Sequence, residues 1–317
     1  MKVHHCSLKC GIARTKEFEK KGLAQYAANV GTRCGHQCTY CSTPALMRMH
    51  PSFKEAGESP FAEGYALVDP ATLERIRRDA RRVQHRGMIQ LCTIVDAWAP
   101  EAQELDLGHQ CLEAILAEPG WTIRILTKNA AVASDYDLIE KHRDRVLVGL
   151  SITGTPDQEE VLKAIEPYAS AIRERMAALR EAHARGLRTY GMFCPLLPGI
   201  ADSPEQIDEL VRFACECGAE EIFAEAVNPR GRGLILTQEA LAEHGHHEQA
   251  QAVGAVRDKA RWSRHVADLV RRVQHSVQQF HDLSKLRFLL YPDGLTPSDV
   301  ATIQRDDVGI VWLGKKQ

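Results

Sequence analysis

Three cysteines in a short loop constrain this chain more than any other feature of its sequence. Cys34, Cys38 and Cys41 are spaced CxxxCxxC, directly after an apolar run at residues 26–30 that is typical of a β-strand. A loop can turn its side chains inward, so three thiolates at this spacing can bind one soft metal centre. A structural zinc ion or an ordinary four-iron cluster needs a fourth ligand, and none follows at a short spacing. Three protein ligands would leave one iron of a [4Fe–4S] cluster open to a further molecule.

The motif resembles that of the radical S-adenosylmethionine (SAM) superfamily, because an aromatic residue, Tyr40, precedes the last cysteine. The resemblance implies that Cys34, Cys38 and Cys41 hold a [4Fe–4S] cluster whose open iron binds the amino and carboxylate groups of SAM. It also implies reductive cleavage of SAM to a 5′-deoxyadenosyl radical, which abstracts a hydrogen atom from a substrate. A structural zinc site and three unrelated buried cysteines are the alternatives, since a free cysteine is often only a small apolar residue.

The composition is that of an ordinary globular protein. The chain has 317 residues, of which 44% are hydrophobic and 26% charged, enough for one large α/β domain with an extension. No apolar run reaches the roughly 18 residues of a membrane span, and the N-terminus lacks the apolar core of a signal peptide. Ten cysteines without an export signal predict a reducing, cytoplasmic compartment.

The net charge of −2 gives the chain as a whole no attraction for nucleic acid. One helix is nevertheless predicted to be rich in arginine, at Arg75, Arg77, Arg78, Arg81, Arg82 and Arg86. These side chains spread around much of the helix, so a solvated surface is the simpler interpretation and a phosphate-binding strip is the alternative.

Alternating strand and helix patterns over residues 25–227 predict a parallel sheet with helices outside it. Strands are expected at 25–31, 88–95, 122–126, 146–152, 188–193 and 221–227. Helices are expected at 45–49, 69–85, 101–116, 136–142, 156–185 with a break near Pro167, and 203–217. The fold class is therefore α/β, and the resemblance implies a partial (β/α)6 TIM-like barrel. In such a barrel the active site lies at the C-terminal ends of the strands.

The segments on either side of this predicted barrel differ in character. Residues 1–24 are a polar N-terminal segment, in which Cys6 and Cys10 could bind a second metal. Residues 50–69 are expected to be irregular chain on the surface. Residues 228–317 are predicted to be a C-terminal mixed α/β extension packed on the barrel. It should have helices at 238–243, 255–280 and 297–303 and strands at 285–291 and 309–313, with a polar loop around residues 244–247.

Further motifs resemble one branch of the superfamily, the spore photoproduct lyase and its "DNA repair photolyase"-like relatives. They lie between Tyr26 and Gly233, at residues 93–101, 126–129, 151–153, 165–167 with Arg175, and 195–202. The resemblance implies that Lys128 contacts SAM, where its ammonium can pair with the methionine carboxylate. It suggests the same of Glu166 and Arg175, which could also form an ion pair across the break at Pro167.

Other candidate cofactor-binding residues follow from their places at strand ends. Asp96 ends a strand beside the cysteine loop, where it could accept hydrogen bonds from the ammonium or ribose of SAM, or else N-cap the helix at Pro100. Ser151 and Thr153 alternate on one strand and share a face, where hydroxyls suit ribose or carboxylate contact. Strand ends often carry such residues without a chemical role. Tyr40 completes the predicted set.

Cys194 ends the fifth predicted strand and points to the barrel centre if the alternation holds. Spore photoproduct lyase uses a cysteine to return a hydrogen atom to its product radical, but no motif here matches that donor. Cys194, like Cys92, is therefore a candidate hydrogen donor, with a core cysteine as the alternative.

The sequence thus predicts a radical SAM enzyme with a [4Fe–4S] cluster and SAM as cofactors and a reductant such as flavodoxin or ferredoxin. Repair or modification of a DNA or nucleotide lesion is the predicted reaction class. Radical modification of a peptide or small metabolite is the alternative. A non-enzymatic iron–sulfur or zinc protein is a candidate of a different class.

Overall fold

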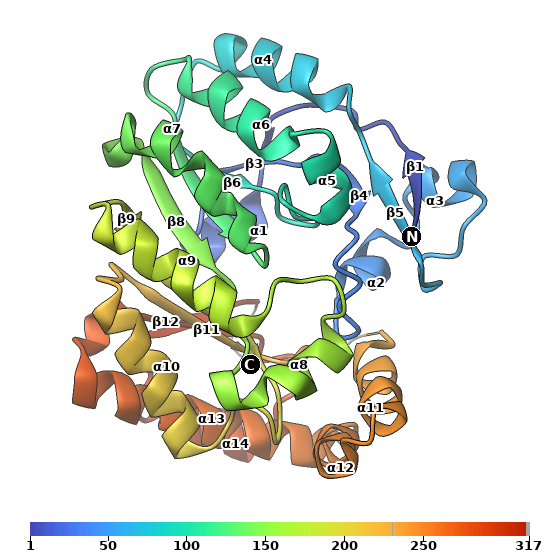
Figure 1. Cartoon of the computed structure of the whole chain (residues 1–317). Helices are drawn as coiled ribbons and strands as arrows, with labels where there is room; N and C mark the ends of the chain where they lie inside the picture. Colours follow the sequence, from blue (N-terminus) through green and yellow to red (C-terminus); the bar gives the residue numbers. More distant parts are fainter. Residues whose placement is uncertain (230, 315–317) are drawn as a thin grey trace.

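The computed structural model describes residues 1–229 and 231–314, and parallel strands form its centre (Figure 1). One sheet has the order β2-β3-β6-β7-β8-β9 and a second the order β10-β11-β12-β13. Every pairing in the two sheets is parallel except that of β2 with β3. A parallel bridge between Ser151 and Met192 joins the end of β8 to β10. The predicted α/β fold with a parallel sheet is confirmed.

Most strands lie where they were predicted, although many are shorter. The single strand expected at 188–193 is wrong, because β9 and β10 are separate strands that belong to different sheets. The first sheet contains β2 (Ala13–Arg14), β3 (Tyr26–Ala28), β6 (Met88–Leu91), β7 (Thr122–Thr127), β8 (Val146–Leu150) and β9 (Arg188–Thr189). The second contains β10 (Gly191–Leu196), β11 (Ile222–Ala226), β12 (Leu286–Leu290) and β13 (Ile310–Trp312). The predicted extension therefore adds two strands, β12 and β13, to the parallel sheet beyond β11.

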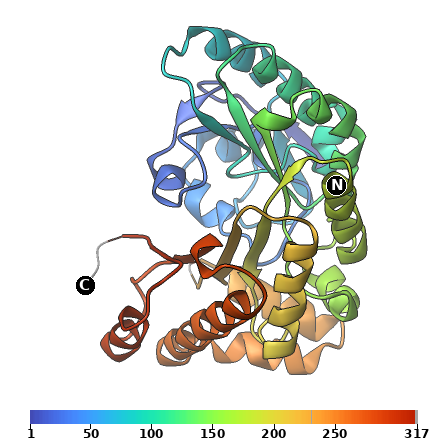
Figure 2. The same cartoon turned by 90° about the vertical axis from the view of Figure 1, so that its left-hand side faces the viewer.

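Helices cover the outer faces of the sheets (Figures 1 and 2). They are α4 (Thr72–Arg82), α5 (Pro100–Glu104), α6 (Leu107–Leu116), α7 (Tyr136–Glu140), α8 (Glu159–Ile165), α9 (Ile172–Ala184), α10 (Pro204–Glu216), α13 (Lys259–Phe280) and α14 (Pro297–Gln304). The predicted break near Pro167 in the helical stretch 156–185 is confirmed, because residues 166–171 form a loop between α8 and α9.

The sequence specifies α10 through its ends and its apolar face. Ser203 accepts a hydrogen bond from the Gln206 N–H, and the Gln206 side chain accepts one from the Ser203 N–H, which is a capping box. Pro204 occupies the first turn, where its missing N–H costs nothing. Ile207, Leu210 and other residues at helical spacing are buried against the sheet.

Helix α4 begins at Thr72 rather than at residue 69 as expected, and Asp69 does not cap it. Ala71 is the N-cap and provides no side-chain hydrogen bond. The Asp69 carboxylate instead accepts a hydrogen bond from the Leu8 N–H at 2.7 Å and pairs with Arg75. Asp69 therefore ties the N-terminal segment to α4.

The prediction that residues 50–69 are irregular chain is wrong. This segment contains α3 (Pro51–Ala56) and β5 (Tyr65–Val68). A small third sheet has the order β1-β5-β4, with β1 (Lys2–His5) and β4 (Gly31–Arg33) on either side of β5. The buried β5 is short, and its partners are distant in sequence, so local patterns did not indicate it. The short α2 (Thr43–Met47) follows the cysteine loop.

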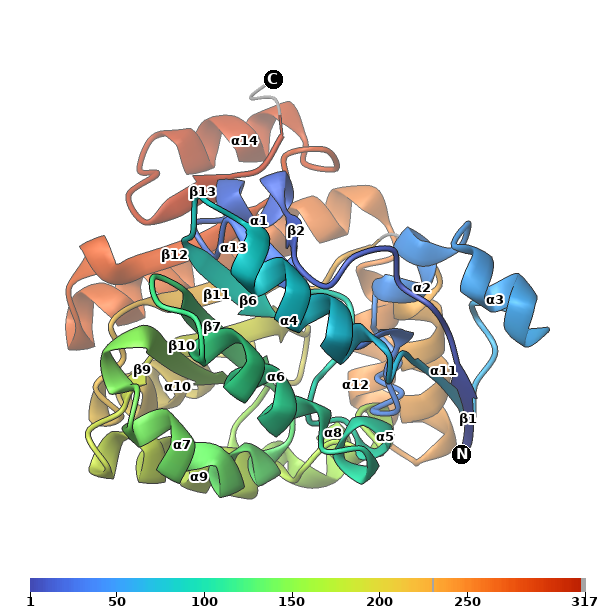
Figure 3. The ribbon, with the colours of Figure 1, turned by 90° about the horizontal axis from the view of Figure 1, so that it is seen from above.

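The N-terminal segment packs between the first and the last strands. Its helix α1 (Lys16–Lys20) lies beside β2, β12 and β13 (Figure 3). Phe18 and the buried Leu23 join an inner core to which both sheets contribute, with Leu147, Tyr190, Met192, Phe223, Leu289 and Leu313. The Tyr291 hydroxyl donates a hydrogen bond to Glu17 at 2.8 Å. Residues 16–23 thereby fill the side of the fold that the strands leave open.

The polar loop predicted around residues 244–247 is only a tight turn at Gly245, which has a φ of +83°. It separates α11 (Gly233–Glu243) from α12 (His247–Ala255). Among the described residues, none of the helices has both the length and the apolar character needed to cross a membrane.

Candidate cofactor site

A cavity of about 270 Å³ lies at the C-terminal ends of the parallel strands. Its lining comes from the cysteine loop, from α1 and from the ends of β6, β7, β8 and β10. The lining residues are Phe18, Cys34, His36, Cys38, Tyr40, Cys41, Ser42, Thr43, Cys92, Thr93, Ile94, Val95, Asp96, Leu126, Thr127, Lys128, Ser151 and Cys194. The cavity thus collects most of the predicted site residues at the edge where a parallel α/β fold places its active site.

The three cysteines of the loop all line this cavity. Cys34, Cys38 and Cys41 are half-buried free thiols. Within the described residues, no three His, Cys, Asp or Glu side chains lie close enough to share a single metal ion. The thiolates that bind a four-iron cluster attach to different iron atoms, so they lie further apart than ligands of one ion. Three soft donors around one cavity suit a cluster by their chemistry.

Two of the thiols are strongly affected by burial. Burial raises the pKa of Cys38 to about 12, and the Glu166 carboxylate adds to this effect. Burial also raises the pKa of Cys34 well above its usual range, with a further contribution from Glu101. Both side chains are therefore neutral thiols without a metal, and metal binding would have to release their protons.

Glu101 supports the backbone of the cysteine loop. Its two carboxylate oxygens each lie 3.0 Å from the Gly35 N–H, which donates to them. A Cβ atom at Gly35 would lie 2.4 Å from Oε2 of Glu101, so a larger residue at this position would have to displace the Glu101 carboxylate. Burial raises the pKa of Glu101 to about 7.

Asp96 connects the cysteine loop to the end of β7. It lies 2.9 Å from Nε2 of His36, and it accepts hydrogen bonds from the Thr127 hydroxyl and from the Lys128 and Trp98 N–H groups at 2.8–2.9 Å. The alternative that Asp96 caps α5 is wrong, because Ala99 is the N-cap and no side chain caps that helix. The remaining His36 nitrogen, Nδ1, lies 3.0 Å from the Tyr168 carbonyl oxygen.

Glu166 is the centre of a second buried group. It pairs with Arg175, accepts a hydrogen bond from the Tyr40 hydroxyl, and accepts another from the Thr153 hydroxyl at 2.8 Å. The Lys128 ammonium lies 3.1 Å from Oε1 of Glu166. The predicted ion pair between Glu166 and Arg175 is present, and both side chains are almost completely buried.

Lys128 reaches the cavity from the end of β7. Its ammonium also donates a hydrogen bond to the Ser151 hydroxyl at 2.8 Å and lies 5.5 Å from the centre of the Tyr40 ring. An ammonium has three N–H donors, and the contacts with Glu166 and Ser151 account for two of them. One N–H of Lys128 therefore remains for a ligand in the cavity.

The other predicted residues divide between the wall and the support of the cavity. Ser151 lines the cavity, and its hydroxyl donates to the Cys194 carbonyl oxygen at 3.0 Å. Thr153 is fully buried and contacts Glu166 rather than the cavity. Cys194, on β10, lines the cavity, and so does Cys92, which follows β6 and has a φ of 63°.

Several residues of this site were not predicted. His36 lies inside the CxxxCxxC motif, and Thr127 and Asn129 flank Lys128, so the sequence placed them nearby without indicating their partners. The Asn129 amide donates to the Trp98 carbonyl oxygen at 2.7 Å and fixes the neighbouring loop. Phe18 was not predicted, because it enters the cavity from α1, in an N-terminal segment that is largely polar.

Two other sequence features lie away from the cavity. Cys10 is exposed, and Cys6 is half-buried beside an apolar cluster with Phe53 and Tyr65. The arginines of α4 and the loop after it form ion pairs with neighbouring acids, among them Arg75 with Asp69, Arg77 with Glu74, Arg78 with Asp79, and Arg81 and Arg86 with Glu118. These pairs favour a solvated surface over a phosphate-binding strip.

Comparison with known proteins identifies one matching family and several distant relatives. The family model of the radical SAM superfamily matches residues 28–214. An uncharacterized protein of Acidianus two-tailed virus is 23% identical over 225 residues, which are 69% of this chain and 72% of the viral protein. An uncharacterized protein of Mycobacterium bovis is 24% identical over 215 residues, which are 67% of this chain and 62% of the bacterial protein.

Solved structures of spore photoproduct lyase have a similar fold. A tyrosine-to-phenylalanine variant of that enzyme matches with a TM-score of 0.55 and 16% identity, over 88% of this chain and 78% of its own. A cysteine-to-serine variant matches with a TM-score of 0.50 and 17% identity, over 76% of this chain and 66% of its own. At these identities the likeness concerns the fold.

Proposed function

The chain belongs to the radical SAM superfamily, and from this membership we propose that it is a SAM-dependent radical enzyme. In this proposal Cys34, Cys38 and Cys41 hold a [4Fe–4S] cluster, and SAM occupies the rest of the cavity. The observation that carries it is the convergence of three free thiols and the Lys128 ammonium on one cavity at the strand ends.

The cofactors supply the difficult chemistry, and the protein supplies binding and orientation. When bound and reduced, the cluster and SAM provide reductive cleavage of SAM and hydrogen-atom abstraction. Lys128 contributes its remaining N–H, which can donate to the carboxylate of SAM in a charge-assisted hydrogen bond. The apolar wall of the cavity, including Ile94, Val95 and Leu126, limits the access of water.

Asp96 and Glu166 act as positioning residues in this proposal. Each carboxylate already accepts several hydrogen bonds from protein groups, which leaves little capacity for SAM. Asp96 orients His36 in the cysteine loop and the backbone of Lys128. Glu166 orients Tyr40 and the ammonium of Lys128, and Arg175 balances its buried charge.

Cys194 is the candidate hydrogen donor to a product radical. Its support is its place on β10 in the wall of the same cavity that the cysteine loop lines. Burial raises the pKa of the Cys194 thiol well above its usual range, so it keeps the S–H bond that a hydrogen donor needs.

The substrate belongs to one of two classes. The fold shared with spore photoproduct lyase supports a nucleotide lesion. The acidic lining of a second pocket, described below, favours a peptide or a small metabolite. A flavodoxin or ferredoxin in a reducing, cytoplasmic compartment is the proposed source of electrons.

Anaerobic reconstitution with iron and sulfide tests the proposed cluster. We expect about four iron atoms per chain and the absorbance of a [4Fe–4S] centre, both lost in Cys38→Ser. Cys10→Ser is the matched control, because Cys10 is exposed and far from the cavity, and it should keep the iron. About eight iron atoms per chain would instead indicate a second cluster, and bound zinc without iron would refute the proposal.

A further inference from the structure

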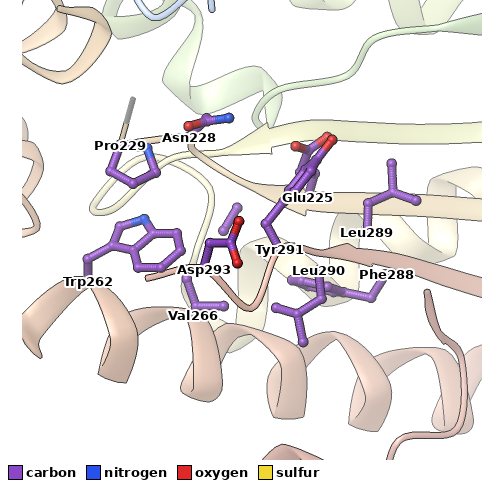
Figure 4. A pocket seen from close by; sticks show the side chains of 11 residues that line it. Glu225, Asn228, Pro229, Trp262, Val266, Phe288, Leu289, Leu290, Tyr291 and Asp293 are labelled. Carbon is purple, nitrogen blue, oxygen red and sulfur yellow. The ribbon is translucent and has the colours of Figure 1, made fainter. Parts of the chain in front are cut away.

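A second pocket lies at the same edge of the sheet, beyond β10 (Figure 4). It is formed by the ends of β11 and β12, the turns that follow them, and one face of α13. Ala226, Val266, Phe288 and Leu290 make an apolar floor, and Trp262 and Tyr291 bring aromatic rings to it. The radical SAM model ends at residue 214, so these residues lie outside the matched region.

Glu225 is the distinctive polar group of this pocket. Its side chain leaves β11 toward the pocket and ends near Tyr291 (Figure 4). Among the described residues, no hydrogen-bond donor or cation lies within bonding distance of its carboxylate. The nearby Lys21 ammonium lies over the rings of Phe18 and Tyr291, 5.3 and 5.4 Å from their centres. Burial raises the pKa of Glu225, and the charge of Lys21 offsets only part of this effect. The Glu225 side chain is half-buried, and a carboxylate with no hydrogen-bond donor within bonding distance keeps its acceptor capacity, so this position favours a ligand that donates to it.

The second pocket adjoins the cofactor cavity. Phe193 of β10 pairs with Ala224 of β11, so the next residues on the two strands, Cys194 and Glu225, are neighbours. Cys194 lines the cofactor cavity and Glu225 lines the second pocket. A molecule held at Glu225 would therefore extend to Cys194 and into the space where the proposed hydrogen abstraction takes place.

We propose that this pocket binds an ammonium group of the substrate, with Glu225 as its counter-ion and Tyr291 and Trp262 as aromatic walls. The proposal rests on the proposed function, since it makes this pocket the substrate side of the cofactor cavity. The carboxylate and the aromatic rings would both stabilise a bound ammonium group. The carboxylate accepts a charge-assisted hydrogen bond from it, and the faces of the rings attract its positive charge.

Charge and size both favour an ammonium over a phosphate. The described residues that line the pocket include the Glu225 carboxylate and no lysine or arginine, so a phosphate would meet like charge at Glu225. The enclosed space is about 70 Å³, which suits a head group of a few atoms. A free amine and an amine on a peptide side chain share this chemistry.

Binding of n-butylammonium chloride to the reconstituted full-length protein tests the proposal. Saturation-transfer NMR would compare it with 1-butanol, a neutral probe of the same chain length, and with thymidine 5′-monophosphate. We expect the ammonium to bind and Glu225→Gln to weaken it by about tenfold or more. Glu225→Asp should retain part of the affinity. Glu209→Gln, an exposed glutamate on α10, is the control and should bind as the wild type does.

Equal binding of n-butylammonium by the wild type and Glu225→Gln would overturn the proposal, and so would tighter binding of the nucleotide at this pocket. Thermal unfolding of Glu225→Gln shows whether this variant folds, because glutamine keeps the size of the side chain and a melting temperature close to that of the wild type excludes misfolding as the cause of weaker binding. Iron content and SAM cleavage are measured separately. A pocket that binds the ammonium in a protein that does not cleave SAM would refute the proposed function alone.

A lysine-containing peptide and a free diamine, putrescine, then distinguish the two sources of the amine. Each is tested as a competitor of n-butylammonium in the wild type. Displacement by either one supports the proposal and names the source. Failure of both to compete at concentrations where n-butylammonium binds would contradict an ammonium-bearing substrate.

Discussion

Asp96 and Glu166 are both buried carboxylates of the site, and both stay ionised for the same physical reason. Burial alone would raise the pKa of each, but His36 beside Asp96 and Arg175 with Lys128 beside Glu166 more than offset it and lower both pKa values. A buried charge is stable only when it is paired and hydrogen-bonded. The two groups therefore hold the loop and strand ends that form the cofactor cavity.

Glu166→Gln should destabilise the protein substantially. It leaves the buried Arg175 without a counter-ion, which costs about 3–5 kcal/mol in the free energy of unfolding at neutral pH. Since the folded pKa of Glu166 is lowered, the stability it contributes is present above the unfolded pKa of about 4.3 and is lost as the pH falls below that value. Urea unfolding at two pH values measures both effects.

Glu160→Gln is the matched control for this change, because Glu160 is an exposed glutamate on the neighbouring α8. Its substitution should change the free energy of unfolding by less than about 0.5 kcal/mol. Glu166→Gln and Glu160→Gln with the same stability would show that the buried ion pair is unimportant for the fold.

Lys128→Met should weaken SAM binding and leave the cluster in place. The loss of one charge-assisted hydrogen bond, about 1.5–3 kcal/mol, corresponds to a dissociation constant raised roughly 10- to 150-fold. Equilibrium dialysis of SAM against the reconstituted protein measures it. Lys141→Met, at an exposed lysine, provides the comparison, and an unchanged affinity in Lys128→Met would remove Lys128 from the SAM site.

At the scale of the elements, the N-terminal segment has a larger role than its polar composition indicates. Its α1 and the residue Leu23 contribute to the inner core, to which both sheets also contribute. Leu23→Ala should therefore cost about 2–5 kcal/mol of stability. Leu46→Ala, at a leucine that is 64% exposed on α2, should cost little. Similar unfolding free energies for the two variants would contradict the closing role of this segment.

A histidine on α6 should give the protein a pH-dependent link between elements. Nδ1 of His109 lies 2.8 Å from Asp135, and this interaction raises the pKa of His109. The stability it adds is complete below the unfolded pKa of about 6.5 and is lost as the pH rises through the higher folded pKa. The wild type should therefore exceed His109→Gln in stability by more at about pH 6 than at about pH 9. A stability difference between the wild type and His109→Gln that is the same at both pH values would exclude a pH-dependent contact between His109 and Asp135.

Elements with strong local patterns could be predicted from the sequence, and those that depend on distant partners could not. The apolar, β-branched runs of β7 and β8 and the capped, periodic α10 gave clear signals. The four-residue β5 is a strand because β1 and β4 flank it, and nothing within its own sequence specifies those partners. The same reason explains why α3 and β5 were expected to be irregular chain.

At the scale of the whole molecule, the fold brings together site residues that the sequence could only place one at a time. The cysteine motif and the strand-end positions of Asp96, Lys128 and Ser151 could be predicted from the sequence, because parallel strands present their C-terminal ends at one edge of the sheet. The hydrogen bonds around Asp96 and Glu166 join residues as far as 126 positions apart. Such pairings depend on the complete fold, so the division between ligands and positioning residues needed the structure.

The fold also arranges the proposed cofactor cavity and the second pocket side by side. The family match ends before β11, whereas the second pocket is made by β11, β12 and α13. The part of the chain that the family shares thus forms the cofactor side, and the part beyond it forms the proposed substrate side.

Reductive cleavage of SAM tests the central claim most directly. The reconstituted protein is incubated anaerobically with dithionite and SAM, and 5′-deoxyadenosine is measured by chromatography for the wild type, for Cys34→Ser, Cys38→Ser and Cys41→Ser, and for the control Cys10→Ser. The account predicts 5′-deoxyadenosine from the wild type and the control and none from the three loop variants. Cleavage that persists in any loop variant, or a wild type with a full cluster that never cleaves SAM even with amine substrates present, would contradict it.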